Sequence, residues 1–180
     1  METPFACART IADFLNEKFK EYDEKEPASG IPYSAYAGML PRFDKAAEMK
    51  KHCPGIAVRP RLIEDARKET LAKMTIYAVT YENDLKFGIG TLYHLLEFMR
   101  FHLLSNNPIK KQYEIKLRDE DMMETFIPDE QPYPFWIGRI DFAAYLEQPS
   151  NSRIMGKMNQ WGRRNNNGKG EKSRGNGRTA

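Results

Sequence analysis

The strongest pattern along the chain is helical and covers residues 87–104. Its apolar residues recur at three- and four-residue steps, which places them on one side of a helix about 27 Å long. Further apolar residues widen this stripe, so the helix is expected to pack on a sheet and on something else besides. A second helix is predicted by the same spacing over residues 4–20. The apolar positions of the two helices are Ile89, Leu92, Tyr93, Leu95, Leu96, Phe98, Met99, Phe101, Leu103 and Leu104, and Phe5, Ala8, Ile11, Ala12, Leu15 and Phe19.

Strand patterns occupy much of the remaining chain. Residues 55–60 predict a short strand that ends at Pro60, and residues 71–81 predict a longer strand. The longer strand carries apolar side chains on both faces, which is typical of a strand that is central or covered by another subunit. Three further strands are predicted over residues 113–118, 122–127 and 135–146.

The order of these elements predicts an α+β fold. We expect a mostly antiparallel sheet of about five strands, with two main helices packed on it. Prolines and glycines indicate an irregular insertion over about residues 23–55, in which residues 44–51 suit a short helix with Asp44 near its N-cap. The domain is expected to cover residues 1–149. Residues 150–180 are predicted to form an irregular, basic, Gly/Asn-rich tail that is flexible or ordered by a partner.

The net charge of +3 averages two unlike regions. Residues 150–180 hold eight basic residues and one acidic residue, a charge of +7, while residues 1–149 hold 20 basic and 24 acidic residues, a charge of −4. Such a tail can contact nucleic acid, because each neutralised phosphate releases counterions. A solvated tail, or a docking peptide that orders on a partner, fits the same composition. The candidate polyanion contacts are Arg163, Arg164, Lys169, Lys172, Arg174 and Arg178.

No residue pattern typical of an active site or a cofactor site stands out. His94 and His102 lie about 12 Å apart along the predicted helix, too far to share one metal ion. Gly88 and Gly90 lack the third glycine of a dinucleotide site, and no Gly-Lys-Ser/Thr follows them. We therefore predict no enzymatic activity, no cofactor and no metal. A hydrated acidic loop is the expected role of Asp119, Glu120, Asp121 and Glu124.

Two further observations concern the cellular setting. Cys7 and Cys53 are too few for a disulfide framework. No apolar stretch reaches the length of a membrane-spanning helix, and residues 1–14 lack the apolar core of a secretion signal. We expect a protein that is made in the cytoplasm and has no membrane partner.

A segment rich in proline and aromatic residues, Glu130-Gln-Pro-Tyr-Pro-Phe-Trp-Ile-Gly138, leads into the last predicted strand. This segment resembles the C-terminal part of tail terminator (tail completion) proteins of long-tailed phages and prophages of Gram-positive bacteria. The order of parts before it is similar too, and the resemblance covers about residues 55–149. The matching features are Val58-Arg59-Pro60, the strand and acidic turn of residues 75–84, the helix that runs into Asn106, the strand of residues 113–117, and Glu147-Gln-Pro149.

The resemblance implies a structural protein of the virion, located in the tail or neck after assembly in the host cytoplasm. It implies a homo-oligomeric ring, usually a hexamer, that caps the completed tail tube. Its partners would be the tail tube protein, the head-completion or connector proteins, and the sheath if the tail is contractile. The alternative is a nucleic-acid-binding accessory protein that acts through its basic tail.

The residues singled out as motif or interface candidates share rigidity or large apolar area. Two prolines fix the backbone before the last strand, and an aromatic residue before Pro134 favours a cis bond there. The three aromatic side chains can serve either the domain core or a subunit interface. The full set is Arg59, Pro60, Gln131, Pro132, Tyr133, Pro134, Phe135 and Trp136.

Overall fold

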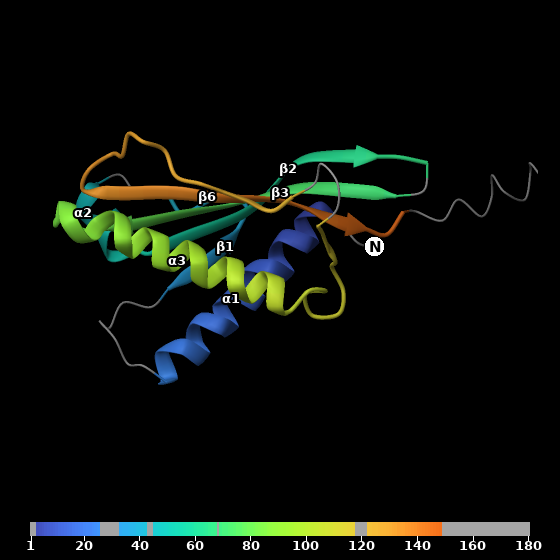
Figure 1. Ribbon diagram of the computed structural model, residues 1–180, viewed down its shortest axis with the longest axis horizontal. Helices are drawn as coiled ribbons and strands as arrows, with labels where there is room; N and C mark the ends of the chain where they lie inside the picture. The colour runs from blue at the N-terminus through green and yellow to red at the C-terminus, as the bar shows by residue number, and fades with distance from the viewer. Residues whose placement is uncertain (1–2, 26–32, 43–44, 68, 118–121, 149–180) are drawn as a thin grey trace, which may run out of the picture. The chain divides into compact units, whose positions relative to one another are not determined.

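The structure is a computed structural model that describes residues 3–25, 33–42, 45–67, 69–117 and 122–148. The candidate polyanion contacts of the tail, Asp44 and the acidic residues 119–121 lie outside these ranges. Figure 1 labels the main elements of the described part. In chain order they are α1 (Pro4–Lys25), β1 (Ser34–Ala37), α2 (Ala46–Lys51), β2 (Gly55–Asp65), β3 (Thr70–Tyr81), α3 (Leu85–Ser105), β4 (Ile115–Lys116), β5 (Glu124–Phe126) and β6 (Phe135–Leu146).

The predicted α+β class is confirmed, but the sheet is mixed rather than mostly antiparallel. Its strand order is β1-β2-β3-β6-β4, and β5 also pairs with β6. β1 runs parallel to β2, because the connection through α2 returns the chain in the same direction. This strand was missed, since four residues inside a segment expected to be irregular give no readable alternation.

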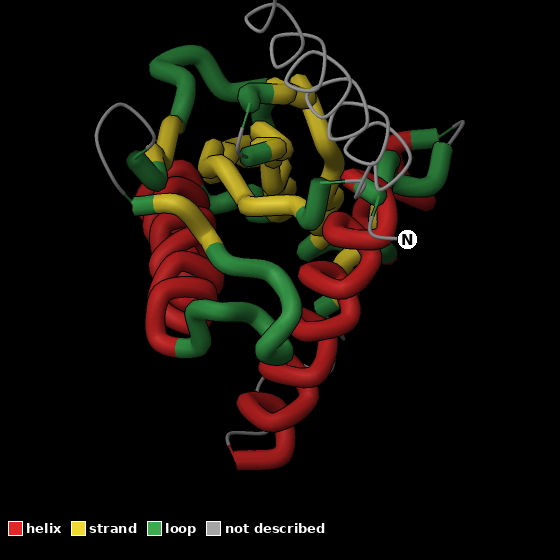
Figure 2. The backbone as a smooth tube through the Cα atoms, turned by 90° about the vertical axis from the view of Figure 1, so that its right-hand side faces the viewer, coloured by secondary structure: helices red, strands yellow, loops and turns green. Residues whose placement is uncertain are grey.

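The central position predicted for residues 71–81 is confirmed. β3 pairs along its whole length with β6 on one side and with β2 on the other. α1 packs against β1 and β2, and α3 packs against β3 and β6. Figure 2 shows the two long helices as separate rods beside the strands. The largest fully buried side chains therefore come from both helices and the sheet, among them Ile11, Leu15, Ile56, Met74, Ile76, Leu92, Leu96, Met99 and Leu103.

The expectation that Pro60 ends its strand is wrong, because β2 continues to Asp65 through an irregularity between Pro60 and Leu62. The amide N–H of Gly38 donates to the carbonyl of Val58 (2.7 Å), so the N–H and C=O of Val58 face away from β3. Pro60, two residues later, faces the same way. Since β1 has ended there, the missing N–H of Pro60 breaks no bond of the sheet.

The helices also differ from the expectation in extent. α1 continues to Lys25, and a third helix, α2, occupies part of the segment where a short helix was predicted. None of the helices in the described ranges is long and apolar enough to cross a membrane.

Candidate functional site

The motif that carries the sequence resemblance forms a closed corner before β6. We name residues 131–136 the proline corner. Gln131 binds the start of β6: its side-chain oxygen accepts from the amide of Ile137 (2.7 Å), and its amide nitrogen donates to the carbonyl of Pro128 (2.7 Å). The Tyr133–Pro134 bond is cis. The hydroxyl of Tyr133 donates to the carbonyl of Asn83 (2.8 Å), which ties the corner to the turn before α3.

Trp136 belongs to the domain core, which decides between the two roles left open for it. Its side chain is only 8% exposed, and its Nε1 donates to the carbonyl of Glu82 (3.0 Å). The first turn of α3 lies directly on the indole: a Cβ at Gly88 would be 2.1 Å from Trp136 Cε2. Gly88 is thus present because the helix approaches the ring closely.

The sheet end of the corner is packed in the same way. Gly138 lies under α3, where an added Cβ would be 2.8 Å from Leu96 Cδ1. Phe135 meets Tyr81 edge to face, with ring centroids 5.3 Å apart. Of the aromatic residues in the corner, Tyr133 is the most exposed, at 53%. The corner is therefore mainly a brace that joins β6 to the end of β3 and the start of α3.

Arg59 and Pro60 are not part of the proline corner. Arg59 pairs across the sheet with Thr75, whereas the first residue of β6 pairs with Tyr81, six positions further along β3. At about 3.4 Å per residue, roughly 20 Å separate the two places. The guanidinium of Arg59 lies over the ring of Tyr77 (4.4 Å to the centroid) and donates to its hydroxyl (2.9 Å).

The sheet face away from α1 and α3 carries a polar cluster around Asp141. The hydroxyl of Thr75, which is fully buried, donates to Asp141 Oδ1 (2.5 Å), and Arg139 Nε donates to Asp141 Oδ2 (2.8 Å). The guanidinium of Arg139 also lies over the ring of Phe126 (4.7 Å). Each charge in this cluster has an opposite charge or a ring beside it, so the cluster reads as cross-strand support for β3, β5 and β6.

The outer side of α3 carries large side chains that the described part of the chain leaves exposed. Phe87, His94 and Phe101 follow one another at seven-residue steps, so they lie on one side of the helix. Phe87 is 60% exposed and Phe101 is 63% exposed. We name these three residues the outer stripe of α3. The buried residues of the same helix, such as Leu92 and Met99, face the sheet.

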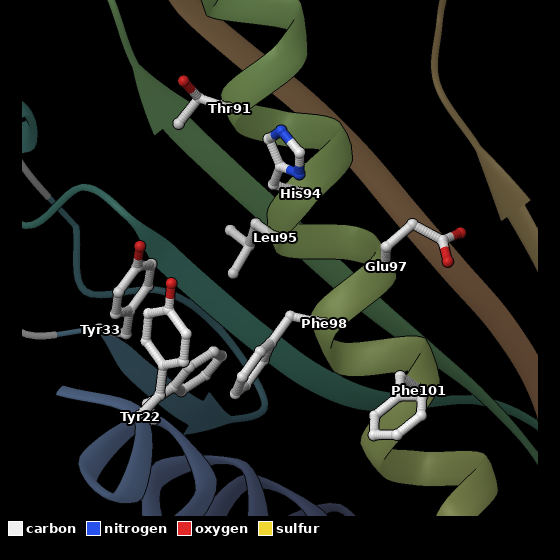
Figure 3. A pocket seen from close by; sticks show the side chains of 9 residues that line it. Tyr22, Tyr33, Thr91, His94, Leu95, Glu97, Phe98 and Phe101 are labelled. Atoms are coloured by element: carbon white, nitrogen blue, oxygen red, sulfur yellow. The ribbon is translucent and has the colours of Figure 1, made fainter. Parts of the chain in front are cut away.

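A depression of about 650 Å³ lies between this stripe and α1. Its base is an aromatic stack in which Phe19 lies between Tyr33 and Phe98, with centroid distances of 4.9 and 5.1 Å. Figure 3 shows Phe98 pointing toward Tyr22, while the carboxylate of Glu97 points to the other side of the helix. Burial raises the pKa of Tyr33, and the nearby Tyr22 and Asp23 raise it further.

The depression offers aromatic surface rather than reactive groups. His94 lies at its edge, whereas His102 packs edge to face on Phe98 (4.4 Å). Within the described ranges no three residues of His, Cys, Asp or Glu are placed to hold a metal ion. The stack joins residues 19, 33 and 98, so its existence depended on tertiary packing that no local pattern reveals.

No family model matches the chain, and no curated protein is similar to it.

Proposed function

We propose that this chain is a structural protein of a phage virion that caps the completed tail tube as a homo-oligomeric ring and joins it to the neck. The proposal starts from the resemblance of residues 55–149 to tail terminator proteins. Its partners are other copies of the chain, the tail tube protein and the head-completion or connector proteins. No catalytic residue, cofactor or metal enters this role.

The observation that carries the proposal is the exposed outer stripe of α3. A helix whose inner side fills the core normally presents polar residues outward. Here Phe87 and Phe101 remain mostly exposed, and Tyr93 and Leu85 on the same helix are exposed as well. Exposed aromatic side chains along one side of a helix favour a protein contact. In a ring, each copy would bury this stripe against its neighbour.

The proline corner has an indirect part in this role. It holds the start of α3 through Tyr133 and Trp136, and so sets the direction in which the outer stripe points. A change in the corner should therefore affect assembly through folding, whereas a change in the stripe should affect assembly alone.

The test compares particles made with the native chain and particles made without it. Without a cap, tails should vary in length and heads should remain unattached. Tails of normal, fixed length with heads joined would contradict the proposal. Light scattering after size-exclusion chromatography, on the free protein and after mixing with tail tubes, measures whether rings form.

The second candidate, a nucleic-acid-binding accessory protein, is favoured by the charge of +7 in residues 150–180. Binding through phosphates weakens steeply as salt rises. If this role holds, affinity for duplex DNA falls with salt in this manner and is lost when residues 150–180 are deleted. Affinity that survives the deletion would exclude it.

A further inference from the structure

The far part of β2 has an edge that no strand pairs with in the described part of the chain. β1 pairs only with Gly55 to Val58, and the order of strands ends with β1 on this side. Figure 1 shows β2 continuing beside β3 well past the end of β1. Since Pro60 has no N–H to offer, we name residues 61–65 the open edge.

The direction of each peptide group on the open edge follows from the hairpin turn. The amide of Ala66 donates to the carbonyl of Glu69 (2.8 Å), so the main-chain N–H and C=O of Ala66 point toward the β3 side of the strand. The N–H and C=O of successive residues point alternately to the two sides of a strand. Those of Glu64 and Leu62 therefore also face β3. The N–H and C=O of Asp65 and of Ile63 face outward, so each of these residues offers one donor and one acceptor to a partner strand.

The side chains of the open edge identify the partner. Leu62 is 48% exposed and Ile63 is 49% exposed, on opposite faces of the strand. Basic residues, Arg59 and Arg61, come before them, and acidic residues, Glu64 and Asp65, come after them. A second copy laid antiparallel places the basic end against the acidic end, whereas a parallel copy places like charges together.

We infer that the open edge pairs with the same edge of a second copy, antiparallel and about a two-fold axis at Ile63. In this register the two Ile63 residues, one from each copy, form a hydrogen-bonded pair in which the N–H of each donates to the C=O of the other. The register places Arg61 opposite Asp65, and Leu62 opposite Glu64. The neighbouring symmetric register, centred on Leu62, places Arg61 opposite Ile63 and so loses the Arg61–Asp65 pairs.

This contact does not rest on the proposed ring, because it uses β2 and leaves the outer stripe of α3 uncovered. Changes at Phe87 and Phe101 should therefore leave it intact. Conversely, if the chain pairs through β2 but its removal leaves tail length unaltered, the ring is contradicted and the pairing is supported.

The first experiment is a charge swap, followed by sedimentation velocity of the full chain over a range of concentrations. Arg61→Asp and Asp65→Arg, each alone, put like charges opposite each other and should weaken dimer formation about tenfold, the effect of about 1.4 kcal/mol. The double variant Arg61→Asp/Asp65→Arg should restore it. A double variant as weak as the single ones would overturn the inference.

The second experiment measures the register by cross-linking under mild oxidation. In an antiparallel hydrogen-bonded pair the two Cα atoms lie about 5.5 Å apart, within the range that a disulfide spans, so Ile63→Cys should give a covalent dimer. Leu62→Cys is the matched control: the residue is equally exposed, but its two copies would lie about 8 Å apart and cannot be bridged.

The native cysteines should not interfere with this experiment. Cys7 and Cys53 are buried, and burial raises the pKa of the Cys53 thiol to about 11, so it stays protonated at neutral pH. A dimer yield for Ile63→Cys at least about tenfold above that for Leu62→Cys is the expected result. Equal yields from the two variants, or no dimer from either, would overturn the inference.

Discussion

The proline corner and the open edge of β2 lie toward opposite ends of β3, and they use their polar groups in opposite ways. In the corner, Gln131, Tyr133 and Trp136 all bond to main-chain atoms of their own domain. On the open edge, the peptide groups of Ile63 and Asp65 face outward, and no strand in the described ranges pairs with them. The polar groups of the most distinctive segment therefore bond within the domain, whereas main-chain groups of a less distinctive segment face outward.

This difference shows that a distinctive sequence motif can serve the packing of its own domain rather than contact with a partner. A run of prolines and aromatic residues attracts attention because it is rare, but here its packing explains most of its residues. The surfaces that invite partners are the outer stripe of α3 and the open edge of β2. Mutations in the corner should thus change stability, and mutations on the two outer surfaces should change association.

The largest effect is expected for Gly88→Ala in the first turn of α3. The new methyl group would lie 2.1 Å from Trp136 Cε2, so either the helix or the indole must move. Overpacking of this kind should lower the free energy of unfolding by about 3 kcal/mol, which chemical denaturation can measure.

Gly90→Ala is the matched control, because a Cβ at Gly90 would meet no described atom within 4 Å apart from its chain neighbours and the backbone of its own helix. The change should raise stability by up to about 1 kcal/mol through better helix propensity. If the two alanine variants were equally stable, the close contact between α3 and Trp136 would be refuted.

Trp136→Phe should cost about 2 kcal/mol. It removes the hydrogen bond from Nε1 to the carbonyl of Glu82 (3.0 Å) and part of a buried ring. Tyr133→Phe removes a similar hydrogen bond at an exposed site and should cost no more than about 0.5 kcal/mol. Thermal unfolding of both variants measures the difference, and equal losses would argue against the core position of Trp136.

Thr80→Val should raise stability by about 0.5–1 kcal/mol. The hydroxyl of Thr80 is buried and has no hydrogen-bond partner among the residues that the structure describes, and valine has the same shape without the polar atom. A loss of stability on denaturation would mean that the hydroxyl does have a partner in solution.

The smallest effect on folding is expected on the outer stripe of α3. Phe101→Ser removes a side chain that is 63% exposed, so stability should change by less than about 0.5 kcal/mol. The measurement that should change is the mass of the assembled oligomer. A marked loss of stability with unchanged mass would place Phe101 in the core instead.

Strong periodicity explains what the sequence could predict. The helix over residues 87–104 and the strand over residues 135–146 were predicted within two residues of α3 and β6, because long amphipathic patterns leave little choice. The continuation of β2 past Pro60 could not be predicted, since it depends on which side of the strand faces a partner. The role of Gly88 depends on a tryptophan 48 residues away, which no local pattern contains.

The candidate site was predictable only in part, for the same reason. The sequence identified α3 as a helix with more apolar surface than one contact needs. It left open whether Trp136 belongs to the core or to an interface, and the position of the indole under α3 decided this. The depression beside the stripe was not expected, because Phe19, Tyr33 and Phe98 meet only in the folded chain.

Electron microscopy of phage particles made with Phe87→Asp/Phe101→Asp in place of the native chain tests the central proposal most directly. The double variant must first show the same thermal unfolding as the native protein, as expected for two exposed positions. If the outer stripe of α3 holds copies of the chain in a ring on the tail tube, the particles will show tails of variable length without heads. Particles with tails of uniform length and attached heads would contradict the proposal.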